Sequence, residues 1–81
     1  MDDKYIATRL AAHIKTSQYD MLTGTAAHIQ DMINLNSMNV GRFLLLASAV
    51  GCSMNTYGLL VERIGRTDNF CCAYIYKVTL K

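Results

Sequence analysis

The chain has 81 residues, a length that fits one folded domain spanning 1–81 and is too short for two. Hydrophobic residues make up 52% of the chain and charged residues 17%, a composition that excludes intrinsic disorder and exceeds what a monomer of this size easily buries. The formal net charge of +2 is compatible with nucleic-acid binding but is too small to predict it.

Several classes of protein are disfavoured by what the sequence lacks. The longest uncharged apolar run, 43–52, is about half as long as a membrane-spanning helix, so we expect no membrane segment. Three cysteines cannot all pair within the chain, which favours a reducing cytoplasm. The cysteines and histidines lack zinc-ligand spacing, and neither a Gly-rich phosphate loop nor paired carboxylates on one helix face are found. We therefore expect no metal, no cofactor and no enzymatic activity.

The first predicted element is a helix that is capped by Asp2 or Asp3 and runs to about Thr16. Its apolar residues recur at helical spacing along one face: Ile6, Ala7, Leu10, Ala11 and Ile14. Segment 17–24 carries turn-forming residues and predicts a connection between helices. This connection could include a short extended piece at 19–22.

Two further helices are predicted in the middle of the chain. Thr25 is placed to cap a short helix that ends near Asn34, and its apolar stripe consists of Ala26, Ile29, Met32 and Ile33. Residues 35–37 predict a turn with residues that can cap the next helix. A third helix follows and ends at Gly51, with a buried stripe of Val40, Phe43, Leu44, Ala47 and Val50.

The last third of the chain predicts a β-hairpin. Segments 59–64 and 70–80 are rich in β-branched and aromatic residues, and the loop 65–69 between them has turn-forming residues. The expected fold class is therefore α+β, with three helices followed by a C-terminal antiparallel hairpin.

This order resembles the winged helix-turn-helix family of small DNA-binding regulators from phages, plasmids and bacteria. Segment 25–46 is similar to the family's helix-turn-helix, and Gly58-Leu59-Leu60-Val61-Glu62-Arg63 is similar to the start of its first wing strand. The likeness covers residues 5–80 and implies a winged-helix-like domain.

The resemblance also implies a set of DNA-binding residues. Asn39 and Arg42, at the start of the third helix, would read base edges, because Asn suits adenine and Arg suits guanine. Arg66 at the hairpin tip would lie against the DNA backbone or minor groove, with Arg63 and Lys77 supporting it. Each exposed arginine also has an ordinary interpretation as solvated surface.

Apolar side chains predict a second kind of surface. The outward side of the third helix includes Leu45 and Ala49, and both faces of the second strand are apolar. An interface with a second copy or another protein would account for this surplus, and its candidate residues are Leu45, Ala49, Cys72, Tyr74 and Tyr76.

Two functions remain open on the sequence. The first is a small DNA-binding transcriptional regulator or accessory protein that acts as a homodimer on double-stranded DNA. The alternative is a small phage-type protein that binds and inhibits another protein, in the manner of anti-CRISPR proteins. The element order favours the first function, and the modest charge and the apolar outward stripe favour the second.

Overall fold

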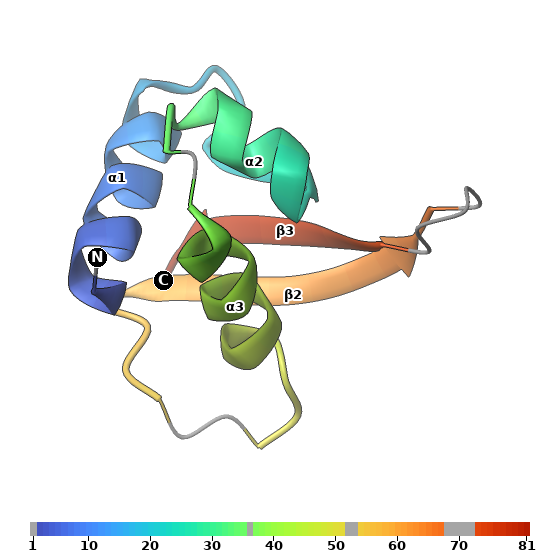
Figure 1. The fold of residues 1–81 in the computed structure, drawn as a ribbon. Helices are drawn as coiled ribbons and strands as arrows, with labels where there is room; N and C mark the ends of the chain where they lie inside the picture. Colours follow the sequence, from blue (N-terminus) through green and yellow to red (C-terminus); the bar gives the residue numbers. More distant parts are fainter. Residues whose placement is uncertain (1, 36, 52–53, 68–72) are drawn as a thin grey trace.

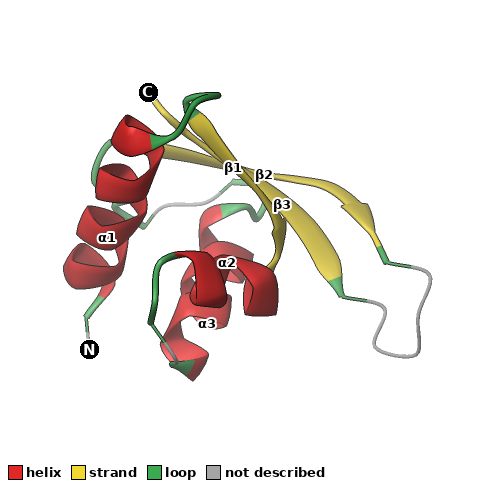
Figure 2. Cartoon of the chain, turned by 90° about the horizontal axis from the view of Figure 1, so that it is seen from above, coloured by secondary structure: helices red, strands yellow, loops and turns green. Residues whose placement is uncertain are grey.

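The computed structural model describes residues 2–35, 37–51, 54–67 and 73–81. Within these ranges the helices and strands follow the order α1 (Asp3–Thr16), β1 (Met21–Thr25), α2 (Ala26–Met32), α3 (Met38–Ala47), β2 (Leu59–Arg66) and β3 (Tyr74–Leu80). The strands form one antiparallel sheet in the order β1-β3-β2, and the helices cover one of its faces (Figure 1, Figure 2).

The strand β1 shows that the predicted order, three helices followed by a C-terminal hairpin, is wrong. β1 lies between α1 and α2 in the chain and pairs with β3, so the sheet has three strands and the hairpin is only part of it. β1 is five residues long and contains Gly24, which weakens any local strand pattern. Its partner lies at the opposite end of the chain, so the pairing leaves no local signal in the sequence.

Gly24 is held in a conformation that only glycine adopts easily. Its φ is +144°, and a Cβ atom at this position would lie 2.6 Å from Cδ2 of His28. The glycine therefore allows the chain to pass from β1 directly into α2.

The three helix starts are set by side chains at their N-caps, as predicted. Asp2 Oδ1 accepts a hydrogen bond of 2.8 Å from the Tyr5 amide, and Thr25 Oγ1 accepts one from His28. At the third helix, Ser37 Oγ accepts a hydrogen bond from the Asn39 amide. Each cap satisfies an amide that the helix itself leaves without a carbonyl partner.

A tight turn joins α2 to α3. Asn34 takes a left-handed conformation with φ of 56°, its amide donates to the Asp31 carbonyl, and the Leu35 amide donates to the Gln30 carbonyl. This pair of hydrogen bonds is the Schellman helix ending, in which asparagine substitutes for the more usual glycine. Gly41 of α3 faces Ala26 of α2, and a Cβ at Gly41 would lie 3.6 Å from Cβ of Ala26, an ordinary packing distance.

The core lies between the helices and the sheet. Its buried side chains come from every element and from the α2–α3 turn: Ile6, Ala7, Leu10, Ile14, Leu22, Ile29, Ile33, Leu35, Val40, Phe43, Leu44, Leu59, Val61, Tyr76 and Val78. Tyr76 is only 4% exposed, so the prediction that it belongs to an intermolecular interface is wrong. The sequence shows two apolar faces on β3, and the fold places that strand between two others with one face on the core.

Candidate functional site

A β-bulge brings two arginines of β2 to the same face of the sheet. Arg63 lies opposite Tyr76 and Arg66 lies opposite Tyr74, with a register shift between Arg63 and Gly65. Residues three apart in a regular strand point to opposite faces, so without this bulge the two guanidinium groups would be separated by the sheet. With it, both side chains share the face on which α3 lies.

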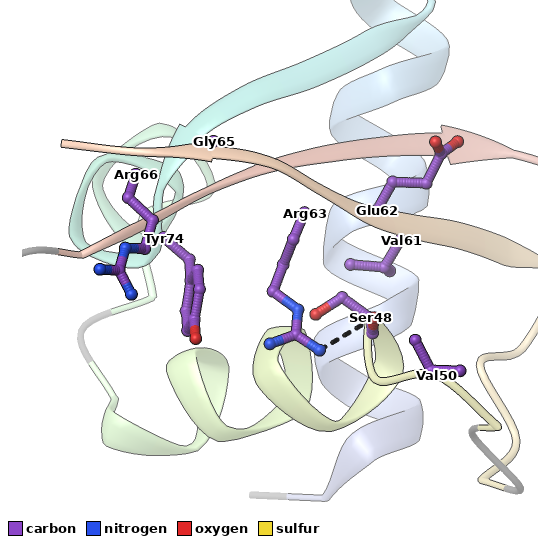
Figure 3. A pocket seen from close by; sticks show the side chains of 8 residues that line it. All are labelled: Ser48, Val50, Val61, Glu62, Arg63, Gly65, Arg66 and Tyr74. Atoms are coloured by element: carbon purple, nitrogen blue, oxygen red, sulfur yellow. Dashed lines mark hydrogen bonds between the residues drawn. The ribbon is translucent and has the colours of Figure 1, made fainter.

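Tyr74 lies between the two arginines (Figure 3). The guanidinium carbon of Arg63 is 4.9 Å from the centre of the Tyr74 ring, and that of Arg66 is 5.8 Å from it. Both distances fall within the range of cation–π attraction, which holds long side chains in place without neutralising their charge. The aromatic ring therefore fixes two cationic groups at one site.

The arginines line an open cleft of about 530 Å³ between the hairpin and the end of α3. The other lining residues include Ser48, Val50 and Val61. Arg63 donates a hydrogen bond of 3.4 Å to the Ser48 carbonyl, at the C-terminal cap of α3. A cation suits this position because the C-terminus of a helix carries partial negative charge. Arg63 thus ties α3 to the sheet as well as contributing charge to the cleft.

Tyr76 is buried next to Tyr74, on the same face of the sheet. Its ring centre lies 6.3 Å from that of Tyr74, with the two planes tilted by 59°. Burial raises the pKa of Tyr76 above its ordinary value of 10.0, the charge of Arg63 opposes this rise, and Tyr74 adds to it. The hydroxyl of Tyr76 therefore stays neutral at physiological pH.

The described acidic residues lie away from the arginine face. Asp2 and Asp3 lie at the start of α1, Asp20 lies before β1, and Asp31 lies on α2. Glu62 contributes to the rim of the cleft, but its carboxylate points to the opposite side of β2 from Arg63 (Figure 3). Within the described ranges, the cleft therefore presents positive charge without a facing carboxylate.

The predicted base-reading residues lie on α3. Arg42 is exposed and Asn39 is partly exposed, and their spacing of three residues makes them neighbours on the helix surface. They share the outward side of α3 with apolar side chains, an outer stripe consisting of Met38, Leu45 and Leu46. Met38 is 91% exposed, so the predicted apolar surplus on the outward side of this helix is present in the fold. The prediction that Val50 belongs to the buried stripe is wrong, because α3 ends at Ala47 rather than at Gly51 and leaves Val50 fully exposed beyond it.

The remaining predicted site residues do not lie together in the fold. Lys77 lies on the opposite face of the sheet from Arg63 and Arg66, so it does not support Arg66 and that part of the prediction is wrong. Ala49 is partly buried just beyond α3. Tyr74, predicted at an intermolecular interface, lies between the arginines instead. The prediction for Cys72 lies outside the described residues.

Sequence reasoning missed the Ser48 carbonyl and the role of Tyr74. No side-chain signal marks a backbone carbonyl that accepts from an arginine. A hairpin register without the bulge would place Arg66 on the wrong face for Tyr74.

Other classes of site receive no support from the described residues. Among them, no group of three or more His, Cys, Asp or Glu side chains is arranged to hold a metal ion, and the three cysteines lie outside the described ranges. No helix in the described part of the chain has the length and apolar character needed to cross a membrane.

Comparison of the chain with protein-family models, with curated proteins and with solved structures finds no match.

Proposed function

We propose that the chain is a winged-helix-type regulator of the cytoplasm that binds double-stranded DNA through the start of α3 and the hairpin. The observation that carries the proposal is the pair of guanidinium groups of Arg63 and Arg66 along Tyr74, on the α3 side of the hairpin. DNA binding draws most of its non-specific affinity from such cations at phosphates.

The α2–α3 pair supplies the framework for reading bases. The Schellman turn and the packing of Gly41 against Ala26 hold the start of α3 against α2. Asn39 and Arg42 then contact base edges in the major groove, where their side chains make paired hydrogen bonds to adenine and guanine. Arg66, which is exposed further along the hairpin, contacts a backbone phosphate.

Arginine replacements test this assignment. The double variant Arg42→Ala, Arg66→Ala removes two exposed cations and leaves the Arg63 hydrogen bond to α3 intact. Fluorescence anisotropy with a labelled random duplex, across a series of salt concentrations, should show weaker binding. If both arginines contact phosphates on random DNA, the slope of log K against log salt should fall in magnitude by about 1.8, since each lost contact accounts for about 0.9.

A matched control uses cations on α1. The double variant Lys4→Ala, Lys15→Ala changes the net charge by the same amount, at exposed positions outside the proposed site. Its binding should be close to that of the wild type. Equal loss in both double variants would show that net charge alone is responsible, and absence of binding at low salt would overturn the proposal.

The outer stripe favours a second candidate function, binding to another protein. Met38, Leu45 and Leu46 leave the outward side of α3 mostly apolar, whereas a helix in the major groove presents polar side chains. In this case the chain would inhibit or modulate a protein target. A photo-crosslinking amino acid in place of Leu45 should then attach to one protein in the cell, and the same group in place of Thr8 on α1 should not. Such a product, together with absent DNA binding, would favour this function.

A further inference from the structure

The face of the sheet opposite the helices is open to solvent. All helices pack against the other face, so the outward residues of the three strands have no cover within the described chain (Figure 2). The strand register arranges them in three rows across the sheet. The first row is Met21, Thr79 and Leu60, the second is Thr23, Lys77 and Glu62, and the third is Thr25, Ile75 and Gly65.

This outer sheet face, defined by those nine residues, carries apolar side chains on both sides of a charged row. Met21 is 36% exposed and Leu60 is 43% exposed. Ile75 is partly exposed at the other end. The middle row holds one acid and one base, Glu62 and Lys77, directly opposite each other on β2 and β3. The face is therefore neutral overall and contains both members of an ion pair.

We propose that this outer sheet face binds the same face of a second copy of the chain. A two-fold axis that runs along the strands, midway between β2 and β3, exchanges these two strands between the copies and leaves β1 of each copy at the edge of the interface. Lys77 of each copy then faces Glu62 of the other, and Leu60 faces Thr79. A two-fold interface requires this reciprocity: if one residue of the first copy contacts a second residue of the other copy, the same two residues also meet with the copies exchanged. A partner with one predominant charge would leave either Glu62 or Lys77 facing its own sign.

Gly65 provides a second observation for the same arrangement. Its φ is not in the left-handed region, and an added Cβ would meet only Cδ1 of Ile75, at 4.0 Å. The fold of a single copy therefore has no steric need for glycine here. Under the proposed axis, Ile75 of one copy faces Gly65 of the other, and the missing side chain leaves space for the isoleucine. Glycine within a strand marks a bulge or the close approach of a ligand or another backbone, and Gly65 lies at the bulge of β2.

The proposal is independent of DNA binding. The outer sheet face lies on the opposite side of the sheet from Arg63, Arg66 and α3, so a dimer formed through it leaves the candidate site open. Failure of either proposal would therefore leave the other intact.

Charge reversal tests the interface. Glu62→Lys makes both charged residues of the middle row basic, and Lys77→Glu makes both acidic. Each variant alone therefore places like charges against each other across the interface. Sedimentation velocity over a concentration series should show a dimer for the wild type. Each single variant should raise the dissociation constant of that dimer by about tenfold or more, because like charges meet twice around the axis.

Mixing the two variants separates the interface from effects within one chain. The mixture should form a heterodimer, since the basic row of one variant then faces the acidic row of the other. Changes of stability within each chain would not be repaired by mixing, so recovery of the dimer only in the mixture supports the proposal.

Two controls complete the test. Asp31→Lys reverses a charge on the exposed side of α2 and should leave the dimer unchanged. Leu45→Asp, on α3, should also leave it unchanged. A monomeric wild type at submillimolar concentration would overturn the proposal, as would a dimer that Leu45→Asp dissociates and the charge reversals leave intact.

Discussion

The helices α1 and α3 pack against the same core but differ on their outward sides. α1 buries Ile6, Ala7, Leu10 and Ile14, and the side turned to solvent carries Lys4, Thr8 and Lys15. α3 buries Val40, Phe43 and Leu44 and exposes Met38, Leu45 and Leu46 around Arg42. On α1 the exposed large apolar side chain is Tyr5, at 47%, whereas α3 exposes three, so the outward side of α3 carries more apolar surface that the fold does not use.

The difference separates side chains that stabilise the fold from exposed side chains that do not. Apolar side chains in water contribute nothing to the stability of a single copy and increase the risk of non-specific association. Their concentration on the helix that also carries Asn39 and Arg42 is consistent with the proposed contact of α3 with DNA or with another protein.

The largest expected effect tests whether the buried sides of the two helices are equivalent. Leu10→Ala on α1 and Leu44→Ala on α3 remove side chains that are both 0% exposed. Each should lower the free energy of unfolding by about 2–5 kcal/mol, through lost burial and the cavity that remains. Urea unfolding followed by circular dichroism measures this, and a small loss in only one of them would show that its helix packs loosely.

A much smaller effect is expected one residue further along α3. Leu45→Ala removes the same atoms as Leu44→Ala from a side chain that is 43% exposed and lies on the outer stripe. The free energy of unfolding should change by less than about 1 kcal/mol, since exposed substitutions away from caps and networks have small effects. A loss as large as that of Leu44→Ala, in the same unfolding experiment, would mean that Leu45 belongs to the core and that the contrast with α1 is false.

The parts of the fold that depend on local patterns were accessible from the sequence. Helical spacing of apolar residues and the capping side chains of Asp2, Thr25 and Ser37 predict the starts of all three described helices. These signals act within one turn of helix, so a few neighbouring residues contain all the information that they need.

The parts that depend on distant pairing were not accessible. β1 becomes a strand because β3 provides its hydrogen-bond partners, and Tyr76 is buried because β3 lies at the centre of the sheet. The bulge after Arg63 decides which face Arg66 takes, and Gly65, a residue type that can mark a bulge within a strand, falls in the segment that the sequence assigns to the hairpin loop. A shift of one position in a strand reverses every later side chain, so the site could not be assembled from the sequence.

The most direct test of the contrast between α1 and α3 is a nitrogen–proton NMR titration of the labelled chain with a random DNA duplex at low salt. The proposal predicts that the largest amide shifts occur at Asn39, Arg42 and Arg66 and that the amides of α1 from Lys4 to Lys15 barely move. Shifts centred on α1, or an unchanged spectrum at low salt, would contradict the account of α3 and the hairpin as the DNA-binding surface.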